Sequence, residues 1–469
     1  MREYKLLIDG ALVDGAAGTM DVVNPATEAP VAACPLADEA QLDAAVAAAK
    51  AAFPAWAARP LAERAALIDR LADAMMERRD EFARLLTQEQ GKPLDQATGE
   101  IMGSVFTLKA FTTMTLDPRV LKDEPGHKVI EYRRPLGVVA AITPWNFPVV
   151  LLMNKVGPAL LSGNTMVAKP APTTPLTSLL FAELAKDILP RGVFNILCDR
   201  NDLGARLSTH PDVAKIAFTG STATGKKVME SAAGSVKRIT LELGGNDAAI
   251  VLDDAEPVET AQKVFQGAMV NAGQVCVAIK RAYVAEPLYD SFCAELARLA
   301  KEAIVDDGDK QGTQVGPLQN KAQYEKVKGF LDDAKANGSI IAGGEALDRP
   351  GYFIPPTIVR DVAPDARIVQ EEQFGPILPV LSYRNVEEVI ADVNRSDYGL
   401  GGTIWGKDVD RAMEIASRID SGTVWVNQAM ALDPSIPFRG AKQSGFGGEL
   451  GEEGLYEYTQ PHIVNAITA

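Results

Sequence analysis

Cys276 is the first candidate in this sequence for a residue that does chemistry. It lies in NAGQVCVAIKR, where a glycine lets the backbone bend and Lys280 and Arg281 follow closely. Positive neighbours, or the charge of a nearby cofactor, would lower its pKa and favour the nucleophilic thiolate. Read alone, however, the segment favours a small buried hydrophobe between Val275 and Val277.

A carboxylate and an amide are the partners that such a nucleophile needs. Glu242, in TLELGGND, ends an apolar strand before a Gly-Gly turn, at the edge where α/β sheets bind ligands. Partial desolvation would raise its pKa and suit it to general-base work. Asn146 lies between two prolines in TPWNFP, so its fixed amide can donate to an oxyanion. The ordinary alternatives are a capping or ion-paired glutamate and a turn asparagine bonded to its own backbone.

A glycine-bearing strand end offers a place for a nucleotide. The strand KIAFTG runs into GSTATG (220–225), whose glycines allow close approach and whose following helix presents free N–H groups to a pyrophosphate. The usual G-x-G-x-x-G fingerprint is absent from the predicted strand–helix turns. An ordinary helix cap at Ser221 or Thr222 explains the same letters equally well.

Length, charge and cysteine content limit the class of protein. A chain of 469 residues suggests two or three domains, and its net charge of 47 − 62 = −15 argues against a nucleic-acid partner. No apolar run approaches the roughly 20 residues of a bilayer span, and the N-terminus does not resemble a signal peptide. We therefore expect a soluble cytoplasmic protein without a membrane partner. Four cysteines without a C-x-x-C pair, and three histidines, predict no metal site.

The elements that must position these residues alternate between helix and strand. Helical periodicity covers 38–90, and polar, β-leaning segments follow at about 117–135. From 136 to 233, short apolar strands alternate with helices, which predicts a mostly parallel sheet with helices on both faces. A second such series, from about 247 to 440, predicts a second α/β domain, and the last stretch (456–469) can add a strand elsewhere.

Motifs along nearly the whole chain resemble those of the aldehyde dehydrogenase superfamily. In order they are NPAT (24–27), PWNFP (144–148), GNTMVAKPAPTTP (163–175), LPRGVFNIL (189–197), FTGSTATG (218–225), LELGGND (241–247), GQVC (273–276), EEQFGP (371–376) and PFRGAKQSGFGGELGEEG (437–454). Many independent motifs in one fixed order make the resemblance highly specific. It implies NAD(P)⁺-dependent oxidation of an aldehyde to a carboxylic acid by a hydrolytic, non-phosphorylating enzyme.

The resemblance implies a catalytic role for each candidate. Cys276 is similar to the family's nucleophile, which forms a thiohemiacetal and then a thioester. Glu242 is similar to the base that activates the hydrolytic water, and Asn146 to the oxyanion donor that acts with the Cys276 backbone N–H. Lys155 and Glu449 match positions proposed to help relay protons.

The same resemblance implies NAD as the first choice of cofactor, with NADP as the alternative. Lys169 matches the residue that holds the adenosine ribose, and Glu372 and Phe374 match the pair that positions the nicotinamide ribose and ring. The predicted cofactor residues are Thr143, Trp145, Lys169, Gly220, Ser221, Gly225, Leu243, Glu372 and Phe374. The predicted substrate-pocket residues are Phe147, Asn154, Leu432 and Phe438.

Three positions depart from the family's usual pattern. Pro172 stands where many NAD-preferring members carry an acid, so a ribose hydroxyl acceptor is lost together with a repulsion toward a 2′-phosphate. Asn154 replaces a frequent large aromatic residue, which predicts a wider and more polar substrate pocket. Arg439 replaces a glycine, and it either meets an anionic substrate or is an exposed or structurally paired arginine.

The resemblance also implies an α/β fold in three parts. A Rossmann-type cofactor domain spans 1–116 and 137–245, and an α/β catalytic domain spans 246–440. A small β extension (117–136 and 455–469) implies a homodimer or homotetramer, and 441–454 returns to the cofactor side. A small-molecule aldehyde is the other expected partner.

Other functions compete with this one. A semialdehyde dehydrogenase would take a substrate with a second carboxylate, and an acyl-transferring relative would use coenzyme A in place of water, against which Glu242 argues. A silent structural or binding protein could keep the fold, but it need not keep Cys276, Glu242 and Asn146 together.

Overall fold

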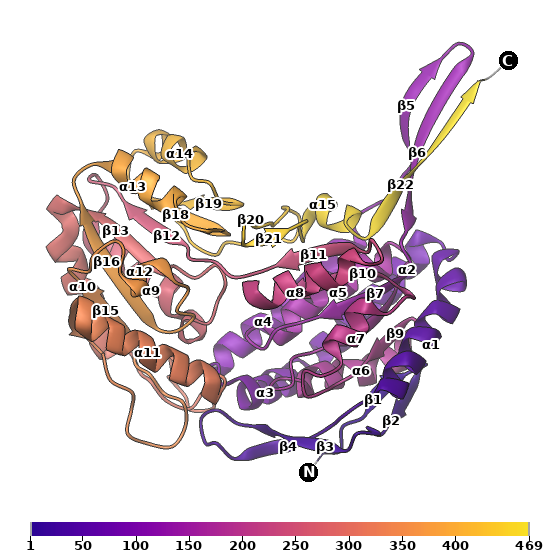
Figure 1. Ribbon diagram of the computed structural model, residues 1–469, viewed down its shortest axis with the longest axis horizontal. Coiled ribbons are helices and arrows are strands. Elements are labelled where there is room, and N and C mark those ends of the chain that lie inside the picture. The colour runs from indigo at the N-terminus through magenta and orange to yellow at the C-terminus, as the bar shows by residue number, and fades with distance from the viewer. Residues whose placement is uncertain (1, 468–469) are drawn as a thin grey trace.

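An eight-stranded sheet, built mainly from the N-terminal half of the chain, contains the strand that ends at Glu242 (Figure 1). The computed structural model describes residues 2–467. The strands are β1 (Leu6–Ile8), β2 (Ala11–Val13), β7 (Val138–Ile142), β8 (Thr165–Lys169), β9 (Phe194–Ile196), β10 (Val213–Thr219), β11 (Arg238–Glu242) and β21 (Gly445–Phe446). They lie in the order β2-β1-β9-β8-β7-β10-β11-β21, and the five from β9 to β11 are parallel. Strands β7 and β8 are buried along their whole length, as expected for a sheet covered on both faces.

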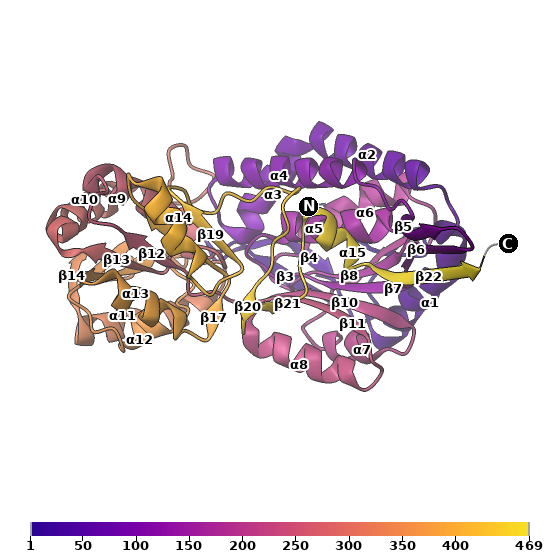
Figure 2. The same cartoon turned by 90° about the horizontal axis from the view of Figure 1, so that it is seen from above.

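Helices cover both faces of this sheet (Figure 2). On one face lie α5 (Pro148–Leu161) and α6 (Leu176–Ile188), with α2 (Leu61–Glu77), α3 (Arg79–Gln90) and α4 (Leu94–Thr112) packed against them. The other face carries α1 (Glu39–Ala57), α7 (Gly204–Thr209) and α8 (Thr222–Ala233). Helix α4 lies beyond the predicted helical region, because its two glycines and scattered polar residues hide its period, whereas packing against α2, α3 and α5 buries it.

A second, seven-stranded sheet carries the segments that flank Cys276. Its order is β14 (Ser339–Ala342), β15 (Thr357–Arg360), β16 (Ile377–Tyr383), β13 (Arg281–Ala285), β12 (Ala248–Val251), β18 (Gly401–Trp405) and β19 (Thr423–Val426), and of these only the edge strand β14 is antiparallel. Around it lie α9 (Pro257–Met269), α10 (Tyr289–Glu302), α11 (Lys321–Asn337), α12 (Arg367–Gln370), α13 (Val386–Asn394) and α14 (Val409–Ser417). The parallel sheets and flanking helices confirm the predicted α/β fold.

A narrow three-stranded antiparallel sheet projects from the body beside the C-terminus (Figure 1). It consists of β5 (Arg119–Glu124), β6 (His127–Pro135) and β22 (Thr459–Ile467), with β22 paired to β6 from Thr459–Pro135 to Ile467–His127. The remaining strands form two short pairs, β3 (Thr19–Val23) with β4 (Pro30–Pro35) and β17 (Tyr398–Gly399) with β20 (Ala441–Lys442). Short helix α15 (Gly451–Tyr456) leads into β22. The limits of the three domains stay a prediction, as does the assignment of cofactor binding, catalysis and oligomerisation to one domain each.

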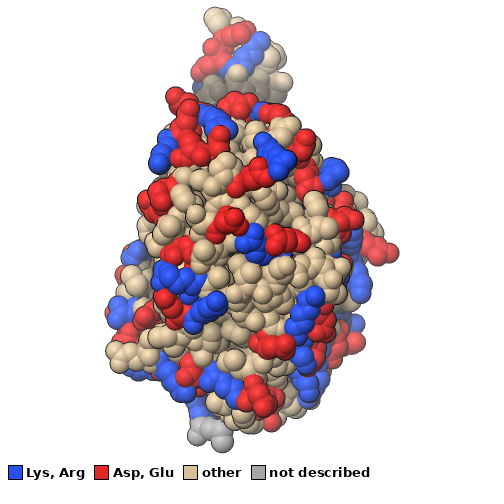
Figure 3. Space-filling view, turned by 90° about the vertical axis from the view of Figure 1, so that its left-hand side faces the viewer, with Lys and Arg blue, Asp and Glu red and all other residues tan. Residues whose placement is uncertain are grey.

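The surface carries both signs of charge. On the face over the second sheet, Lys and Arg side chains alternate with Asp and Glu side chains (Figure 3). Such a mixture gives this face no continuous basic track of the kind that follows a phosphate backbone. Among residues 2–467, no helix is long and apolar enough to cross a membrane.

Candidate active site

Glu242 is the last residue of β11, beside Thr219 at the end of β10, as predicted for a carboxylate at the ligand-binding edge. Its side chain is buried, and neither carboxylate oxygen has a hydrogen-bond partner among the described residues. Burial raises the pKa of Glu242 well above its usual range, and the charge of Glu449 raises it further, against the charges of Lys155 and Arg439. A carboxyl group of this kind can hold a proton near neutral pH or take one from a water molecule.

A buried ion pair lies close behind Glu242. The Lys155 Nζ, on α5, donates to Glu449 Oε1 at 2.6 Å and to Thr219 Oγ1 at 2.6 Å. The Asn154 Nδ2 donates to the other Glu449 oxygen at 3.3 Å. Lys155 and Glu449 are almost three hundred residues apart in the sequence, and the fold brings them together. The charges of both act on Glu242.

The turn that carries Cys276 is backbone-strained. A short helical turn, η1 (Val270–Gly273), precedes it, and both Asn271 (φ 52°) and Ala272 (φ 53°) are left-handed, a conformation that costs non-glycine residues of order 1–3 kcal/mol each. Side-chain hydrogen bonds hold this backbone: Asn271 N donates to Gln96 Oε1 at 2.9 Å, and Gln274 Nε2 donates to Asn271 O at 2.9 Å. Gly273 is required, because a Cβ there would lie 2.3 Å from Gly375 O.

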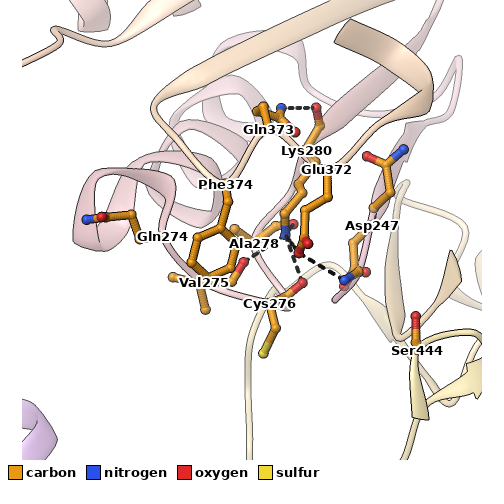
Figure 4. A network of polar contacts seen from close by, with 12 residues as sticks. Asp247, Gln274, Val275, Cys276, Ala278, Lys280, Glu372, Gln373, Phe374 and Ser444 are labelled. Carbon is orange, nitrogen blue, oxygen red and sulfur yellow. Dashed lines mark hydrogen bonds and ion pairs between the residues drawn. The ribbon is translucent and has the colours of Figure 1, made fainter. Parts of the chain in front are cut away.

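Two opposing effects act on the pKa of the Cys276 thiol. Burial raises the pKa of the thiol to about 12, and the charge of Lys280 lowers it without offsetting the burial. The Lys280 ammonium faces backbone carbonyls, among them that of Cys276, whereas the sulfur points away (Figure 4). Arg281 donates to Asn246 O at 3.1 Å. The charge of Lys280 therefore acts in the expected direction, and burial of the thiol outweighs it.

Asn146 joins the first sheet to the Cys276 turn. It lies between β7 and α5, and its Nδ2 donates to Gln274 O at 3.0 Å, two residues before Cys276. The side chain is buried. Since the amide has two N–H groups, one remains for another acceptor. The structure thus brings Asn146 and Cys276 to one turn, as the resemblance implies.

A buried ion pair that the sequence did not reveal holds Asn146 in place. The Lys92 Nζ donates to Asn146 O at 2.9 Å and pairs with Glu100 at 2.5 Å. The other oxygen of Glu100 accepts from Val149 N at 2.9 Å and Val150 N at 3.2 Å, at the start of α5. Both charged side chains are fully buried. Nothing in the local pattern around residues 92 and 100 signals this pair, because its partners lie about fifty residues away.

A cavity of about 610 Å³ follows the carboxyl ends of β7, β8 and β10, within the size range of small-molecule sites. Five of the predicted cofactor residues line it: Thr143, Trp145, Lys169, Gly220 and Ser221. Ser221 caps α8, which confirms the helix cap, and pyrophosphate binding by the GSTATG segment stays a prediction. Gly225 and Leu243 lie behind this wall, where a Cβ on Gly225 would be 2.4 Å from Leu243 Cδ2.

The cavity fits a dinucleotide. Its wall presents Thr143 Oγ1, a buried hydroxyl without a partner among the described residues, and a helix start that can receive phosphate. Lys169 Nζ donates to Asp199 Oδ1 at 2.6 Å and reaches Asn201 Oδ1 at 3.4 Å. Asn201 and Lys227 also line the cavity and were not predicted. Helical spacing was the available signal for Lys227, which follows Thr224 by three residues on α8.

Glu372 and Phe374 lie near Lys280, which bonds the Cys276 turn. Glu372 Oε1 accepts from Gly245 N at 3.0 Å, and burial raises the pKa of this carboxyl. Phe374 stands edge-on to Trp145, with ring centroids 5.4 Å apart, and has a left-handed backbone (φ 51°). The pair therefore adjoins the cavity through Trp145.

The predicted substrate-pocket residues differ in their surroundings. The Phe147 ring lies under the Lys92 ammonium, 3.6 Å from its centroid, and Phe438 is buried and exchanges two 2.7 Å backbone hydrogen bonds with Glu449. Leu432 is half-exposed. Asn154 is buried and its amide donates to Glu449, and its part in a wider, more polar pocket stays a prediction.

Arg439 belongs to a separate surface cavity. It pairs with Glu453, and the two line a hollow of about 290 Å³ together with Arg133, Arg238, Tyr456, Glu457, Thr459 and Pro461. The structure therefore favours the paired arginine over the one that meets an anionic substrate.

Comparison with known proteins identifies the family. The model of the aldehyde dehydrogenase family matches residues 12–464. The chain is 40% identical over 471 residues to a mitochondrial aldehyde dehydrogenase of Leishmania tarentolae, covering 99% of this chain and 95% of the relative. It is 37% identical to an NADP⁺ succinate-semialdehyde dehydrogenase of Escherichia coli, with 97% and 96% covered.

A solved structure agrees with the sequence matches. The NAD⁺ complex of an aldehyde dehydrogenase from Bacillus cereus superposes with a TM-score of 0.97 at 38% identity, covering 100% of this chain and 97% of that one. The chain belongs to the aldehyde dehydrogenase family and is an NAD(P)-dependent oxidoreductase that oxidises aldehydes.

Proposed function

We propose that Cys276 is the nucleophile, that Asn146 and the Cys276 N–H stabilise the oxyanion, and that Glu242 is the base for hydrolysis. The hydrogen bond from Asn146 Nδ2 to Gln274 O carries this proposal, since it ties the amide to the turn of the thiol. The buried, unpartnered carboxyl of Glu242 supports its role. These groups suit covalent capture of an aldehyde.

The reaction then proceeds in two stages on Cys276. The sulfur bonds to the aldehyde carbon, the thiol proton passes to solvent water, and Asn146 holds the oxyanion. Bound NAD(P)⁺ supplies the acceptor for the hydride that leaves this carbon. Loss of the hydride yields a thioester. Glu242 takes a proton from the water that attacks the thioester, the C–S bond breaks, and the carboxylic acid leaves.

We propose that Lys155 and Glu449 carry the proton away from Glu242. Glu242 must lose the proton it takes before the next cycle begins. The Glu449 carboxylate acts on the titration of Glu242, and Lys155 joins Glu449 to Thr219 through two 2.6 Å hydrogen bonds. Together these contacts supply a polar route through an otherwise buried region.

The cavity at the ends of β7, β8 and β10 is the proposed cofactor site. Lys169 would hold the adenosine ribose, the start of α8 at Gly220 and Ser221 the pyrophosphate, and Glu372 with Phe374 the nicotinamide end. NAD is the proposed main cofactor. We propose that NADP is also accepted, because Pro172 adds no negative charge to the cavity wall and Lys227 adds a positive one.

The proposed substrate is an uncharged aldehyde. Arg439, the one departure that suggested an anionic substrate, is paired with Glu453. A semialdehyde remains the second candidate, since relatives named for succinate semialdehyde and glutarate semialdehyde are 37% identical to the chain. Turnover of a neutral aldehyde and an anionic one of matched length separates the two, and faster turnover of the anionic one contradicts the proposal.

The projecting sheet of β5, β6 and β22 is the proposed surface for self-association into a dimer or tetramer. It exposes apolar side chains that a partner would cover, among them Val120, Leu121, Ile463 and Val464. Light scattering measures the assembly, and a monomer at micromolar concentration would contradict this part. We also propose a reducing cytoplasm as the working compartment, because all four cysteines are free.

Cys276→Ala tests the nucleophile. The variant should lose NAD(P)H production, followed by near-ultraviolet absorbance, and still bind the cofactor in a calorimetric titration. Cys293→Ala, which removes a buried thiol of α10, should keep turnover and is the matched control. Substantial aldehyde oxidation by Cys276→Ala would overturn the assignment.

A further inference from the structure

We propose that Lys280 is a positioning residue that fixes the turn of the nucleophile and links it to the carboxylate of Glu372. This proposal rests on the proposed role of Cys276. It gives Lys280 a task beyond that expected of a basic neighbour, because its head group holds the backbone of the turn and does not contact the sulfur (Figure 4).

The Lys280 ammonium is saturated by carbonyls of one turn. Nζ donates to Val275 O at 2.7 Å, to Cys276 O at 2.8 Å and to Ala278 O at 3.3 Å. An ammonium has three N–H donors, so all three are directed at the four residues from 275 to 278. Lys280 is 2% exposed, which means that water cannot replace these donors.

Hydrogen bonds hold the turn on both sides of the cysteine, but the Cys276 carbonyl itself depends on the Lys280 side chain. The strained residues Asn271 and Ala272 are held by Gln96 and Gln274 before the cysteine. After it, Ala278 N donates to Val275 O at 3.2 Å, Ile279 N to Gly267 O at 3.1 Å and Lys280 N to Asp247 O at 2.9 Å. Among the described residues, the Lys280 ammonium is the group that donates to the Cys276 carbonyl. The Cys276 carbonyl also packs against Gly245, where an added Cβ would lie 2.6 Å away. Fixing this carbonyl fixes the direction of the neighbouring peptide groups, and hence of the oxyanion-binding N–H and the sulfur.

The same ammonium faces the residues proposed to bind the nicotinamide end. Nζ lies 3.9 Å from Glu372 Oε1 and 5.9 Å from the centroid of the Phe374 ring. Glu372 Oε1 accepts from Gly245 N, and Glu372 O accepts from Lys326 Nζ at 3.0 Å. Lys280 therefore contacts both the nucleophile turn and the cofactor side, whereas Lys326 contacts the cofactor side alone.

Lys280 is also the cation that opposes three acidic groups around the thiol. The charges of Asp247, Glu372 and Glu242 raise the pKa of Cys276, and the charge of Lys280 lowers it. Glu242 ends β11, Asp247 precedes β12, and Glu372 follows α12, so acids face the thiol from three elements. Removing Lys280 should therefore loosen the turn and leave the thiol harder to ionise.

Lys280→Met and Lys280→Gln, compared with Lys326→Met, test the proposal in the full enzyme. The readouts are kcat, the KM values for aldehyde and NAD⁺, and the pH profile of iodoacetamide alkylation of the Cys276 peptide, followed by mass spectrometry. For Lys280→Met we expect kcat to fall about 10-fold or more at little change in aldehyde KM, and alkylation to move to higher pH. Lys280→Gln keeps a polar group that can donate to the carbonyls of the turn, so this variant should fold. It should show the same shift of the alkylation profile to higher pH, with a smaller loss of kcat.

The outcomes separate this proposal from the nucleophile assignment. Lys326→Met should keep the alkylation profile of the native enzyme, because Lys326 does not contact the turn. Native alkylation and native kcat in Lys280→Gln would overturn the proposal, as would identical effects of Lys326→Met and Lys280→Met. Alkylation reports on Cys276 directly, so its result stands even if Cys276→Ala were to retain turnover.

Discussion

Replacing Asn146 by alanine removes the side-chain amide and leaves the backbone of this residue in place. The Asn146 backbone stays fixed, because its carbonyl accepts from Lys92 Nζ at 2.9 Å and from Asn271 Nδ2 at 3.0 Å. Gln274 O loses the amide at 3.0 Å but keeps Asn271 Nδ2 at 3.3 Å. The cost in free energy of unfolding should therefore be about 1 kcal/mol.

The cost in rate should be much larger. One N–H of Asn146 is used by Gln274 O, so the variant loses a single donor to the oxyanion, and the Cys276 N–H remains. Loss of one such donor slows related reactions about 10²–10³-fold, or 3–4 kcal/mol in the barrier. Because the oxyanion forms before the hydride leaves, the effect should fall on the first NAD(P)H produced.

Stopped-flow absorbance of the first turnover measures this step. We expect the rate of the first turnover to fall about 10²–10³-fold, with cofactor affinity unchanged. Asn195→Ala is the matched control, since it removes a buried amide bonded to Met166 O and Gly192 O in the cofactor half. Asn195→Ala should lower the free energy of unfolding and leave the rate of the first turnover unchanged. A fall of less than about fivefold in Asn146→Ala would refute the oxyanion role, because it is far below the loss expected for one donor.

Three further changes test the surroundings of the site. Lys92→Met leaves Glu100 buried and unpaired and should lower the free energy of unfolding by about 3–5 kcal/mol in urea titrations. Lys109→Met, which breaks an exposed pair, should lower it by at most about 1 kcal/mol, and equal losses in the two variants would count against the role of the buried pair. Burial raises the pKa of Asp247 to about 7. The protonated carboxyl therefore stabilises the folded protein fully below the pKa of the unfolded chain, and this stabilisation is lost as the pH rises toward 7. The free energy of unfolding of Asp247→Asn should therefore rise by about 2–3 kcal/mol relative to that of the native protein between pH 5 and 8. A difference between the two proteins that does not change with pH would contradict this. Pro172→Glu places a charge in the cavity wall and should raise the NAD⁺ to NADP⁺ ratio of kcat/KM about 10-fold or more, whereas an unchanged ratio would show that this wall does not meet the 2′-phosphate.

Strand ends and turns were predictable because their signals are local. The apolar run before Glu242 ends at the turn, and the structure ends β11 at that residue. The same holds for Ser221, whose place after β10 makes it both a helix cap and part of the cavity wall. Family motifs added the pairing of Asn146 with the Cys276 turn, which no local pattern contains.

Partners that meet only in the folded chain could not be predicted. The hydrogen bond from Asn154 to Glu449 joins residues almost three hundred positions apart, so no local pattern contains it. Lys280 was rightly placed beside Cys276, yet burial of the thiol outweighs its charge, and burial is a property of the whole fold. The Lys92–Glu100 pair was missed for the same reason, because its contact with the Asn146 carbonyl forms only in the folded chain.

Trapping the thioester tests the central claim most directly. Glu242→Gln removes the base but keeps the shape of the side chain, so deacylation should slow about 10²–10⁴-fold while one equivalent of NAD(P)H still forms. Mass spectrometry of the quenched protein should then find the acyl group, the mass of the aldehyde less two hydrogens, on the peptide that contains Cys276. An acyl group on another residue, or a burst of NAD(P)H with no adduct on Cys276, would contradict the account.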